Sequence, residues 1–244
     1  MNSNILVGRE SELKALSDSI NNKRNIIVFG QEGVGKTAII SQVLKDRSMG
    51  KVLLSENSSS LKESLENIII SSGDYKGDIR VKNTLSLKKI LYALLDKSPE
   101  YLVFDHVGRV DPKFYSFLTY LIDRKIPLLI VCRGVDKKDI GHLRLSLFAF
   151  EKVEIPNLDK EKTFTLVNRY IEIFGIKLTK EDNFKKEIFH FSKGNPKIIK
   201  KLCFLAHDGK YRRDDSLDVH LIDLDMRIGD VVSKIDKNFV KEDL

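Results

Sequence analysis

The sequence predicts an α/β fold in which a parallel sheet of five strands is flanked by helices and followed by a small all-helical domain. Two observations predict it. Short, continuously apolar runs alternate with stretches whose apolar residues recur every three or four positions, as buried parallel strands do between amphipathic helices. After Pro156 only the helical periodicity remains. We therefore expect a core at 1–156, a helical lid at 157–213, and a tail at 214–244 whose pattern leaves strand and helix open.

Five short segments, most of them apolar, are the predicted strands of the core. They are Asn25–Phe29, Lys51–Leu54, Tyr101–Phe104, Pro127–Cys132 and Lys152–Ile155. Helical periodicity begins near Glu10, resumes after Lys36, and continues through later parts of the core between the strands. Asp111-Pro112 supplies a capping side chain and a first-turn proline for one of these helices. Three further helices are expected in the lid, at about 159–174, 180–192 and 196–207.

Composition is that of a soluble globular protein, with 42% hydrophobic and 32% charged residues. The apolar runs are far shorter than the ~20 residues of a membrane-spanning helix. The first residues lack the basic region and apolar core of a secretory signal. The two cysteines, Cys132 and Cys203, lie in apolar runs and are expected to be buried and reduced. We expect a cytoplasmic protein with no membrane partner.

A phosphate-binding motif follows the first predicted strand. The segment Gly30-Gln31-Glu32-Gly33-Val34-Gly35-Lys36-Thr37 matches G-x-x-x-x-G-K-[ST] in full and opens a helix. Its glycines let backbone N–H groups point at phosphate oxygens, Lys36 can reach the β- and γ-phosphates, and the Thr37 hydroxyl can bind Mg²⁺. We predict a P-loop NTPase that binds ATP and Mg²⁺. The expected nucleotide-binding residues here are Gly30, Glu32, Gly33, Val34, Gly35, Lys36, Thr37 and Ala38.

An acidic residue is expected to complete the metal site. Asp105 follows four apolar strand residues, where a carboxylate is costly unless it is used or hydrogen-bonded, so Thr37 and Asp105 are the predicted metal ligands. The next residue is His106, where many ATPases have a glutamate that polarises the attacking water. Because an imidazole is a poorer base for this task, we expect hydrolysis that is slow or depends on a partner.

Two arginines are candidates for contact with the γ-phosphate. Arg133 directly follows the fourth strand, at the sheet edge where ligands of such folds bind. Arg144, in the segment before the fifth strand, would act across a subunit boundary as an arginine finger. With Lys36, Asp105 and His106 they form the predicted catalytic set. The string Asp105–Gly108 also fits the D-x-x-G of GTPases, but no guanine-specifying N/T-K-x-D follows, which favours ATP.

Excess positive charge is confined to one part of the chain. Residues 156–213 contain 14 lysines and arginines against 7 acidic residues, which leaves 28 of each elsewhere. A one-sided basic surface attracts DNA or RNA, although lysine-rich helices also have solvated basic faces without any partner. The lid residues expected to contact phosphates are Lys185, Lys186, Lys193, Lys200, Lys201, Arg212 and Arg213.

Two further segments resemble those of AAA+ and STAND ATPases. Leu6–Leu13 is similar to their VGRExEL opening, which lies near the adenine, and this implies that Val7, Gly8 and Arg9 contact the nucleotide. Gly194-Asn195-Pro196-Lys197 is similar to their GxP or sensor-2 element, which implies the same for Pro196 and Lys197. The resemblance covers about residues 5–207. The strand-end Arg133 matches the STAND type, and His106 departs from the acidic residue usual in both groups.

The resemblance implies what such a chain does. A compact basic ATPase of this type is most similar to ATP-dependent regulators of transposition and to origin-recognition and helicase-loader ATPases, which assemble on DNA when ATP is bound. We therefore expect a homo-oligomer that acts on DNA. The alternative is an ATP-driven switch that docks a protein partner, for example through the tail. A small-molecule kinase is a third reading, for which the sequence has no acceptor-site signature.

Overall fold

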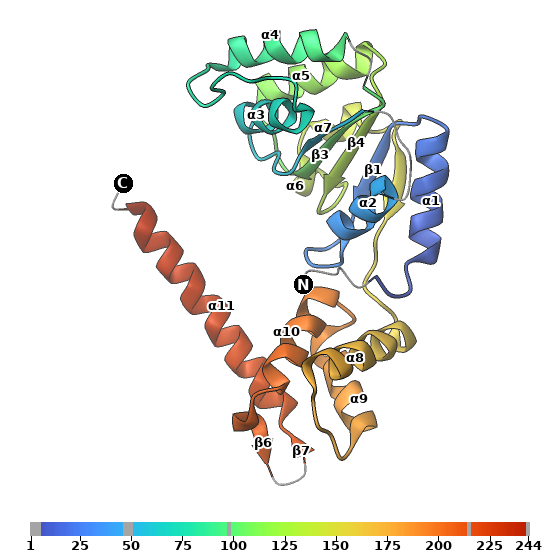
Figure 1. Cartoon of the computed structure of the whole chain (residues 1–244), viewed down its shortest axis with the longest axis vertical. Helices are drawn as coiled ribbons and strands as arrows, with labels where there is room; N and C mark the ends of the chain where they lie inside the picture. Colours follow the sequence, from blue (N-terminus) through green and yellow to red (C-terminus); the bar gives the residue numbers. More distant parts are fainter. Residues whose placement is uncertain (1–5, 46–50, 97–98, 214–215, 243–244) are drawn as a thin grey trace. The chain divides into compact units, whose positions relative to one another are not determined.

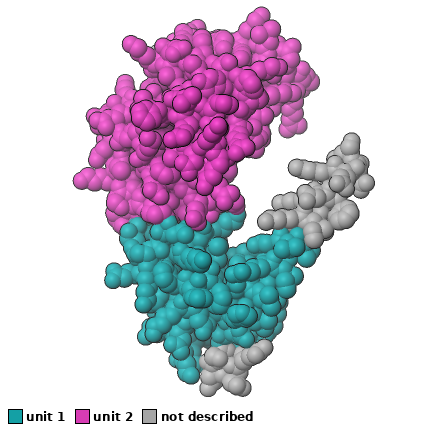
Figure 2. All heavy atoms as spheres, turned by 180° about the vertical axis from the view of Figure 1, so that it is seen from behind, with its two compact units in different colours: residues 1–8, 157–244 teal, residues 9–156 magenta. Residues whose placement is uncertain are grey.

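The computed structural model describes residues 6–45, 51–96, 99–213 and 216–242. They form two compact units. The unit called the first here, in the order of the chain, is residues 9–156 (magenta, unit 2 of the key in Figure 2), and the second is residues 157–213 and 216–242 together with 6–8 (teal, unit 1 of that key). Residues 6–8 group with the second unit because Val7 packs against its hydrophobic core. No helix among the described residues is long and apolar enough to cross a membrane.

The first unit is built on a parallel sheet with the strand order β2-β3-β4-β1-β5 (Figure 1). The strands are β1 (Ile26–Phe29), β2 (Val52–Ser55), β3 (Tyr101–Val107), β4 (Leu128–Cys132) and β5 (Glu151–Glu154). The prediction of a five-stranded parallel sheet is confirmed. Strand β3 differs from its expected length, because it continues beyond Asp105 to Val107 with a shift of register between Phe104 and Val107. This irregularity lies at the carboxyl edge of the sheet, beside the predicted site.

Helices cover the sheet on both faces. They are α1 (Glu10–Asn21), α2 (Lys36–Lys45), α3 (Leu61–Ser72), α4 (Thr84–Leu95), α5 (Pro112–Asp123) and the short α6 (Lys137–Ile140) and α7 (Leu143–Ser146). Side chains of α3, α4 and α5 join Ile27, Phe104 and Ile130 of the sheet in one hydrophobic core. The alternation of strand side chains sends Ile26 and Val28 to the opposite face. There α1 contacts both α2 and β5.

The second unit is mainly helical. Its elements are α8 (Lys160–Phe174), α9 (Glu181–Ser192), α10 (Pro196–Ala206), the 3₁₀ turn η1 (Gly209–Tyr211), a hairpin of β6 (Arg212–Arg213) and β7 (Ser216–Leu217), and α11 (Val219–Glu242). The tail therefore contains a short strand and one long helix. Val219, Ile222 and Met226 of α11 are buried in the same hydrophobic core as α8, α9 and α10. The start of α11 is thus an integral part of this unit.

Candidate functional site

The P-loop joins β1 to α2, and its glycines are required by its geometry. A Cβ atom at Gly30 would collide with the backbone carbonyl oxygen of Ile155, at the end of β5. Gly35 has φ +99, which L-residues with a side chain rarely adopt. These two positions let the backbone curl tightly before Lys36 begins the helix. The N–H groups of this helix start have no partner within the helix and are available to an anion.

Lys36 is held at the mouth of this loop. Its Nζ donates hydrogen bonds to the carbonyl oxygens of Gly30 at 2.7 Å and Gln31 at 2.9 Å. Burial lowers the pKa of Lys36, while the negative charge of Asp105 opposes this effect and the nearby Arg133 adds to it. A phosphate would supply the missing counter-charge. The ammonium group can exchange its two carbonyl partners for phosphate oxygens without leaving the loop.

The predicted metal ligands lie together. The Thr37 hydroxyl donates a hydrogen bond of 2.6 Å to Oδ2 of Asp105, whose side chain is buried. The other carboxylate oxygen accepts a hydrogen bond of 2.7 Å from the backbone N–H of His106. A hydroxyl and a carboxylate are hard oxygen donors, and Mg²⁺ in P-loop proteins takes few protein ligands besides phosphate and water. The residues present therefore fit a magnesium ion.

His106 has an unusual backbone and an exposed ring. Its φ is +59, which is uncommon for a residue other than glycine. The side chain is 67% exposed, and Nδ1 lies 3.3 Å from Oδ1 of Asp105 and 3.1 Å from the carbonyl oxygen of Glu56. The imidazole therefore sits over the end of β2 instead of pointing into the sheet.

Sequence reasoning missed Glu56. This residue follows β2, which pairs directly with β3, and the loop after it is tied to β3 by a hydrogen bond of 2.8 Å from Ser58 N–H to the carbonyl oxygen of Asp105. The Glu56 side chain is exposed. The register of the two strands was the missing signal, since Ser55 pairs with Phe104 and Glu56 therefore comes next to Asp105. The backbone of an acidic residue thus lies beside His106, directly after the neighbouring strand.

The two candidate arginines occupy different places. Arg133 is exposed directly after β4, and its charge acts on Lys36, so it belongs to the same edge of the sheet. Arg144 is exposed on the short helix α7. Two large apolar side chains beside it, Leu145 and Phe148, are 77% and 76% exposed.

Arg9 is buried and supports the P-loop. Its guanidinium donates hydrogen bonds to the carbonyl oxygens of Val34 at 3.0 Å and Pro156 at 2.8 Å, and to Oε1 of Glu12 at 2.7 Å. Burial alone would raise the pKa of Glu12, but hydrogen bonds from Ser11 and Arg9 outweigh it, so this pKa is lowered. Arg9 therefore holds the P-loop in place through the main-chain carbonyl of Val34.

The remaining predicted nucleotide contacts lie in the second unit. Val7 packs in its core, and Gly8, with φ +64, lies against the side chain of Lys162. Pro196 and Lys197 open α10, which is capped by the side chain of Asn195 through the N–H groups of Lys197 and Ile198. The structure thus brings Lys36, Thr37, Asp105 and His106 together within the first unit, and Val7, Gly8, Pro196 and Lys197 belong to the other.

Comparisons with solved structures find a similar fold in other proteins. No family model matches this sequence, and no curated protein matches it. The Walker-type ATPase PABY2304 of Pyrococcus abyssi is similar with a TM-score of 0.62 and 13% identity, over 97% of this chain and 76% of that one. The ORC2 protein of Aeropyrum pernix, in a complex with ADPNP and ADP, is similar with a TM-score of 0.56 and 16% identity. This match covers 90% of this chain and 68% of that one. The replication initiator DnaA, bound to AMPPCP and single-stranded DNA, is similar with a TM-score of 0.53 and 16% identity. This match covers 84% of this chain and 62% of that one. At these identities the similarity is one of fold.

Proposed function

Because this chain has the fold of the AAA+ P-loop ATPases, we propose that it binds ATP with Mg²⁺, hydrolyses it slowly, and assembles with further copies of itself on DNA. The observation that carries the proposal is the contact between the Thr37 hydroxyl and the Asp105 carboxylate beside the ammonium group of Lys36. A P-loop whose lysine and threonine lie beside an acidic side chain supports binding of a nucleotide and a metal ion.

Each residue of this site has a distinct task in the proposal. The P-loop amides hold the phosphates, Lys36 neutralises their outer oxygens, and Thr37 and Asp105 hold the metal ion. Bound magnesium would withdraw charge from the phosphates during transfer to water. Arg133, on the same sheet edge, would bind the terminal phosphate and so distinguish ATP from ADP.

Slow hydrolysis follows from His106. Replacing His106 by glutamate is expected to raise steady-state ATP turnover about tenfold or more, because a positioned carboxylate can take a proton from the attacking water. Phosphate release at saturating ATP measures this. His106→Asn is the matched control, since asparagine tolerates the left-handed backbone and adds no base.

An unchanged turnover in His106→Glu would point to the neighbouring Glu56 as the source of the carboxylate. If Glu56, just after β2, already supplies the carboxylate, His106→Glu leaves turnover unchanged and Glu56→Gln removes most of it. No change in either variant would contradict the proposed hydrolysis at this edge of the sheet.

Self-association is supported by α7. Exposed large apolar side chains next to one another mark interaction surfaces in soluble proteins, and here Leu145 and Phe148 flank the exposed Arg144. An arginine within an interface can reach the nucleotide of a neighbouring copy, where it stabilises the charge that develops during hydrolysis.

Arg144→Ala is expected to keep ATP binding but to abolish ATP-dependent assembly. Size-exclusion chromatography with light scattering, with a non-hydrolysable ATP analogue and with or without duplex DNA, measures this. Arg80→Ala, an exposed arginine elsewhere in the first unit, is the control and should assemble normally. A chain that stays monomeric with the analogue and DNA present contradicts the proposed assembly.

The DNA role rests on charge. All the surplus positive charge lies in 156–213, and one of the similar solved structures is bound to single-stranded DNA. Such charge attracts nucleic acid phosphates without preference for sequence and makes binding weaken steeply with salt.

A second candidate is an ATP-driven switch that docks a protein. One observation favours it: α11 carries exposed apolar side chains on the side away from its buried residues, namely Leu224, Ile228, Val231 and Val232. If the sizing experiment finds ATP binding but no DNA binding, this candidate is preferred.

A further inference from the structure

The second unit contains an open cavity of about 730 Å³ lined only by cationic and aromatic side chains. Its lining residues are Lys160 of α8, Lys186, Phe189, His190 and Phe191 of α9, Lys193 just after α9, and Arg227 of α11. Four of them, at positions 186, 189, 190 and 193, are spaced i, i+3, i+4 and i+7, so they share one face of α9 and its end. Two aromatic rings therefore lie between two lysines along one wall.

The lysines of this cavity have no counter-charge. Lys160, Lys186 and Lys193 make no ion pair with any carboxylate in the described part of the chain. Other basic residues of the unit are engaged: Lys185 pairs with Glu181 at 2.5 Å, and Lys201 pairs with Asp230. Among the cationic residues of the cavity, only Arg227 forms an ion pair with a described carboxylate: its Nε lies 2.7 Å from Oδ2 of Asp223. The cavity thus presents three unneutralised ammonium groups to an anion.

Its aromatic rings are held in place by packing. Phe189 and Phe191 are half-buried, and the ring of Phe191 makes edge contacts with His190 at 5.0 Å and with His220 at 5.9 Å between centroids. Half-buried rings at a cationic surface offer flat apolar faces at little cost in side-chain entropy.

We propose that this cavity binds single-stranded nucleic acid, with the lysines on phosphates and the aromatic rings stacked against unpaired bases. Cationic grooves with interspersed aromatic side chains bind single strands in this way. In a duplex the bases are paired and stacked on one another, so a duplex would contact only the lysines of the cavity. The inference deepens the proposed function, on which its biological role rests, by naming the strand form and the surface. Single-stranded DNA and RNA share the chemistry, so the experiment compares both.

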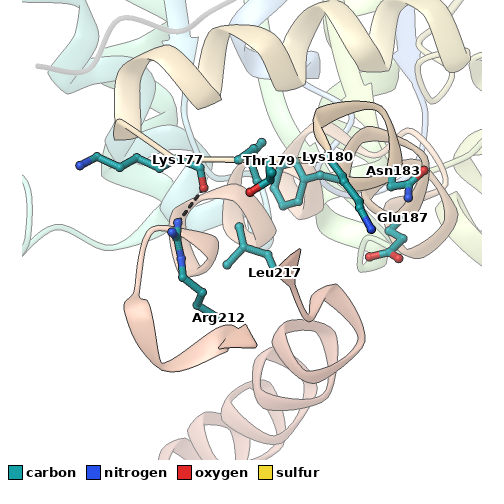
Figure 3. Close-up of a pocket in the computed structure, with 9 residues that line it drawn as sticks. Lys177, Thr179, Lys180, Asn183, Glu187, Arg212 and Leu217 are labelled. Atoms are coloured by element: carbon teal, nitrogen blue, oxygen red, sulfur yellow. Dashed lines mark hydrogen bonds between the residues drawn. The ribbon is translucent and has the colours of Figure 1, made fainter. Parts of the chain in front are cut away.

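A second cavity of the same unit serves as a control (Figure 3). It has a volume of about 220 Å³ and is lined by Lys177, Lys180, Glu187 and Arg212 among others. Here a carboxylate faces the lysines, and Arg212 already donates a hydrogen bond of 2.7 Å to the carbonyl oxygen of Lys177. It is a mixed-charge site, so removing its lysines removes equal charge from the same unit without touching the aromatic cavity.

The test measures fluorescence anisotropy of the full chain with labelled dT and U oligonucleotides and a duplex of equal length, with and without a non-hydrolysable ATP analogue. The charge variant combines Lys186→Ala with Lys193→Asn, because Lys193 has φ +49 and asparagine tolerates that backbone. The ring variant is Phe189→Leu, which keeps apolar volume. The control is Lys177→Ala with Lys180→Ala.

We expect the wild-type chain to bind single strands more tightly than duplex. The charge variant should bind single strands about tenfold more weakly. The negative slope of log affinity against log salt should become shallower by about 1.4, because two phosphate contacts are lost. Phe189→Leu should weaken single-strand binding about tenfold with an unchanged slope. The control pair should stay within about twofold of wild type in affinity.

Three results are distinguishable. The proposal for this cavity is overturned if the control pair weakens binding as much as the charge variant does. It is also overturned if every variant binds duplex as tightly as single strands. Both results leave the proposed DNA role intact. No binding of any nucleic acid, with an ATP-dependent melting shift retained, removes both. Tight binding of U but not dT oligonucleotides keeps the cavity and replaces DNA by RNA in the proposed function.

Discussion

Replacing Lys36 by alanine is expected to abolish the rise in melting temperature that ATP and magnesium produce. In the wild-type chain, ATP at about one hundred times its dissociation constant should stabilise the fold by about 2.7 kcal/mol, roughly 5–10 °C for a chain of this size. Lys36 is the cation inside the P-loop, bonded to two loop carbonyls that a phosphate would replace. Without it the phosphates meet no ammonium group, and the shift should disappear. Differential scanning fluorimetry with an ATP titration measures this.

The control for this result lies on the same helix. Lys45 is an exposed lysine in the last turn of α2, at the end far from the loop. Lys45→Ala should therefore keep the full shift. A shift that survives in Lys36→Ala would mean that the nucleotide binds elsewhere, and the assignment of the P-loop would be wrong.

Arg9→Ala is expected to cost about 3–5 kcal/mol of the free energy of unfolding, because it leaves a buried carboxylate without its ion-pair partner and two carbonyl groups, one of them buried, without their donor. Glu12 would lose its charge-assisted bond, and the carbonyl oxygens of Val34 and Pro156 would face the vacated space. Urea denaturation followed by circular dichroism measures the loss.

Two companions make this prediction specific. Arg9→Lys keeps the charge near Glu12 but cannot reach all three acceptors, so we expect an intermediate loss. Arg24→Ala breaks an ion pair with Glu151 in which the arginine is 60% exposed, and exposed pairs contribute less than about 1 kcal/mol. If Arg9→Ala and Arg24→Ala have the same small effect, the buried arginine does not support the loop.

The sheet and the P-loop were predictable because their signals are local. Four of the five strands are mainly apolar, whereas β5 is Glu151-Lys152-Val153-Glu154 with only Val153 buried. The G-x-x-x-x-G-K-T spacing specifies a turn that only glycine-rich backbone adopts. The cap of α5 was equally local, since Asp111 accepts a hydrogen bond from Phe114 N–H just as the Asp-Pro pair predicts.

Features that depend on pairing between strands were not predictable. The register shift in β3 and the left-handed backbone of His106 arise where β3 passes the ends of β2 and β4. The position of Glu56 beside Asp105 also follows only from the register. No pattern in one segment contains that information.

The tail and Arg9 were ambiguous for a different reason. Helix α11 buries one side and exposes apolar side chains on another, so its sequence lacks the polar face that distinguishes an ordinary surface helix. For Arg9, the motif indicated proximity to the nucleotide, whereas its hydrogen bonds run to the main chain. A sequence gives the residue type, and only the packing gives its acceptors.

Arg9 and one of its acceptors, Pro156, stand at the two points where the polypeptide passes from one unit to the other. The chain crosses between Gly8 and Arg9 and again between Pro156 and Asn157. One guanidinium thus fastens both crossings to Val34, in the middle of the P-loop. The position of the P-loop is therefore linked, within the first unit, to the two residues at which that unit begins and ends.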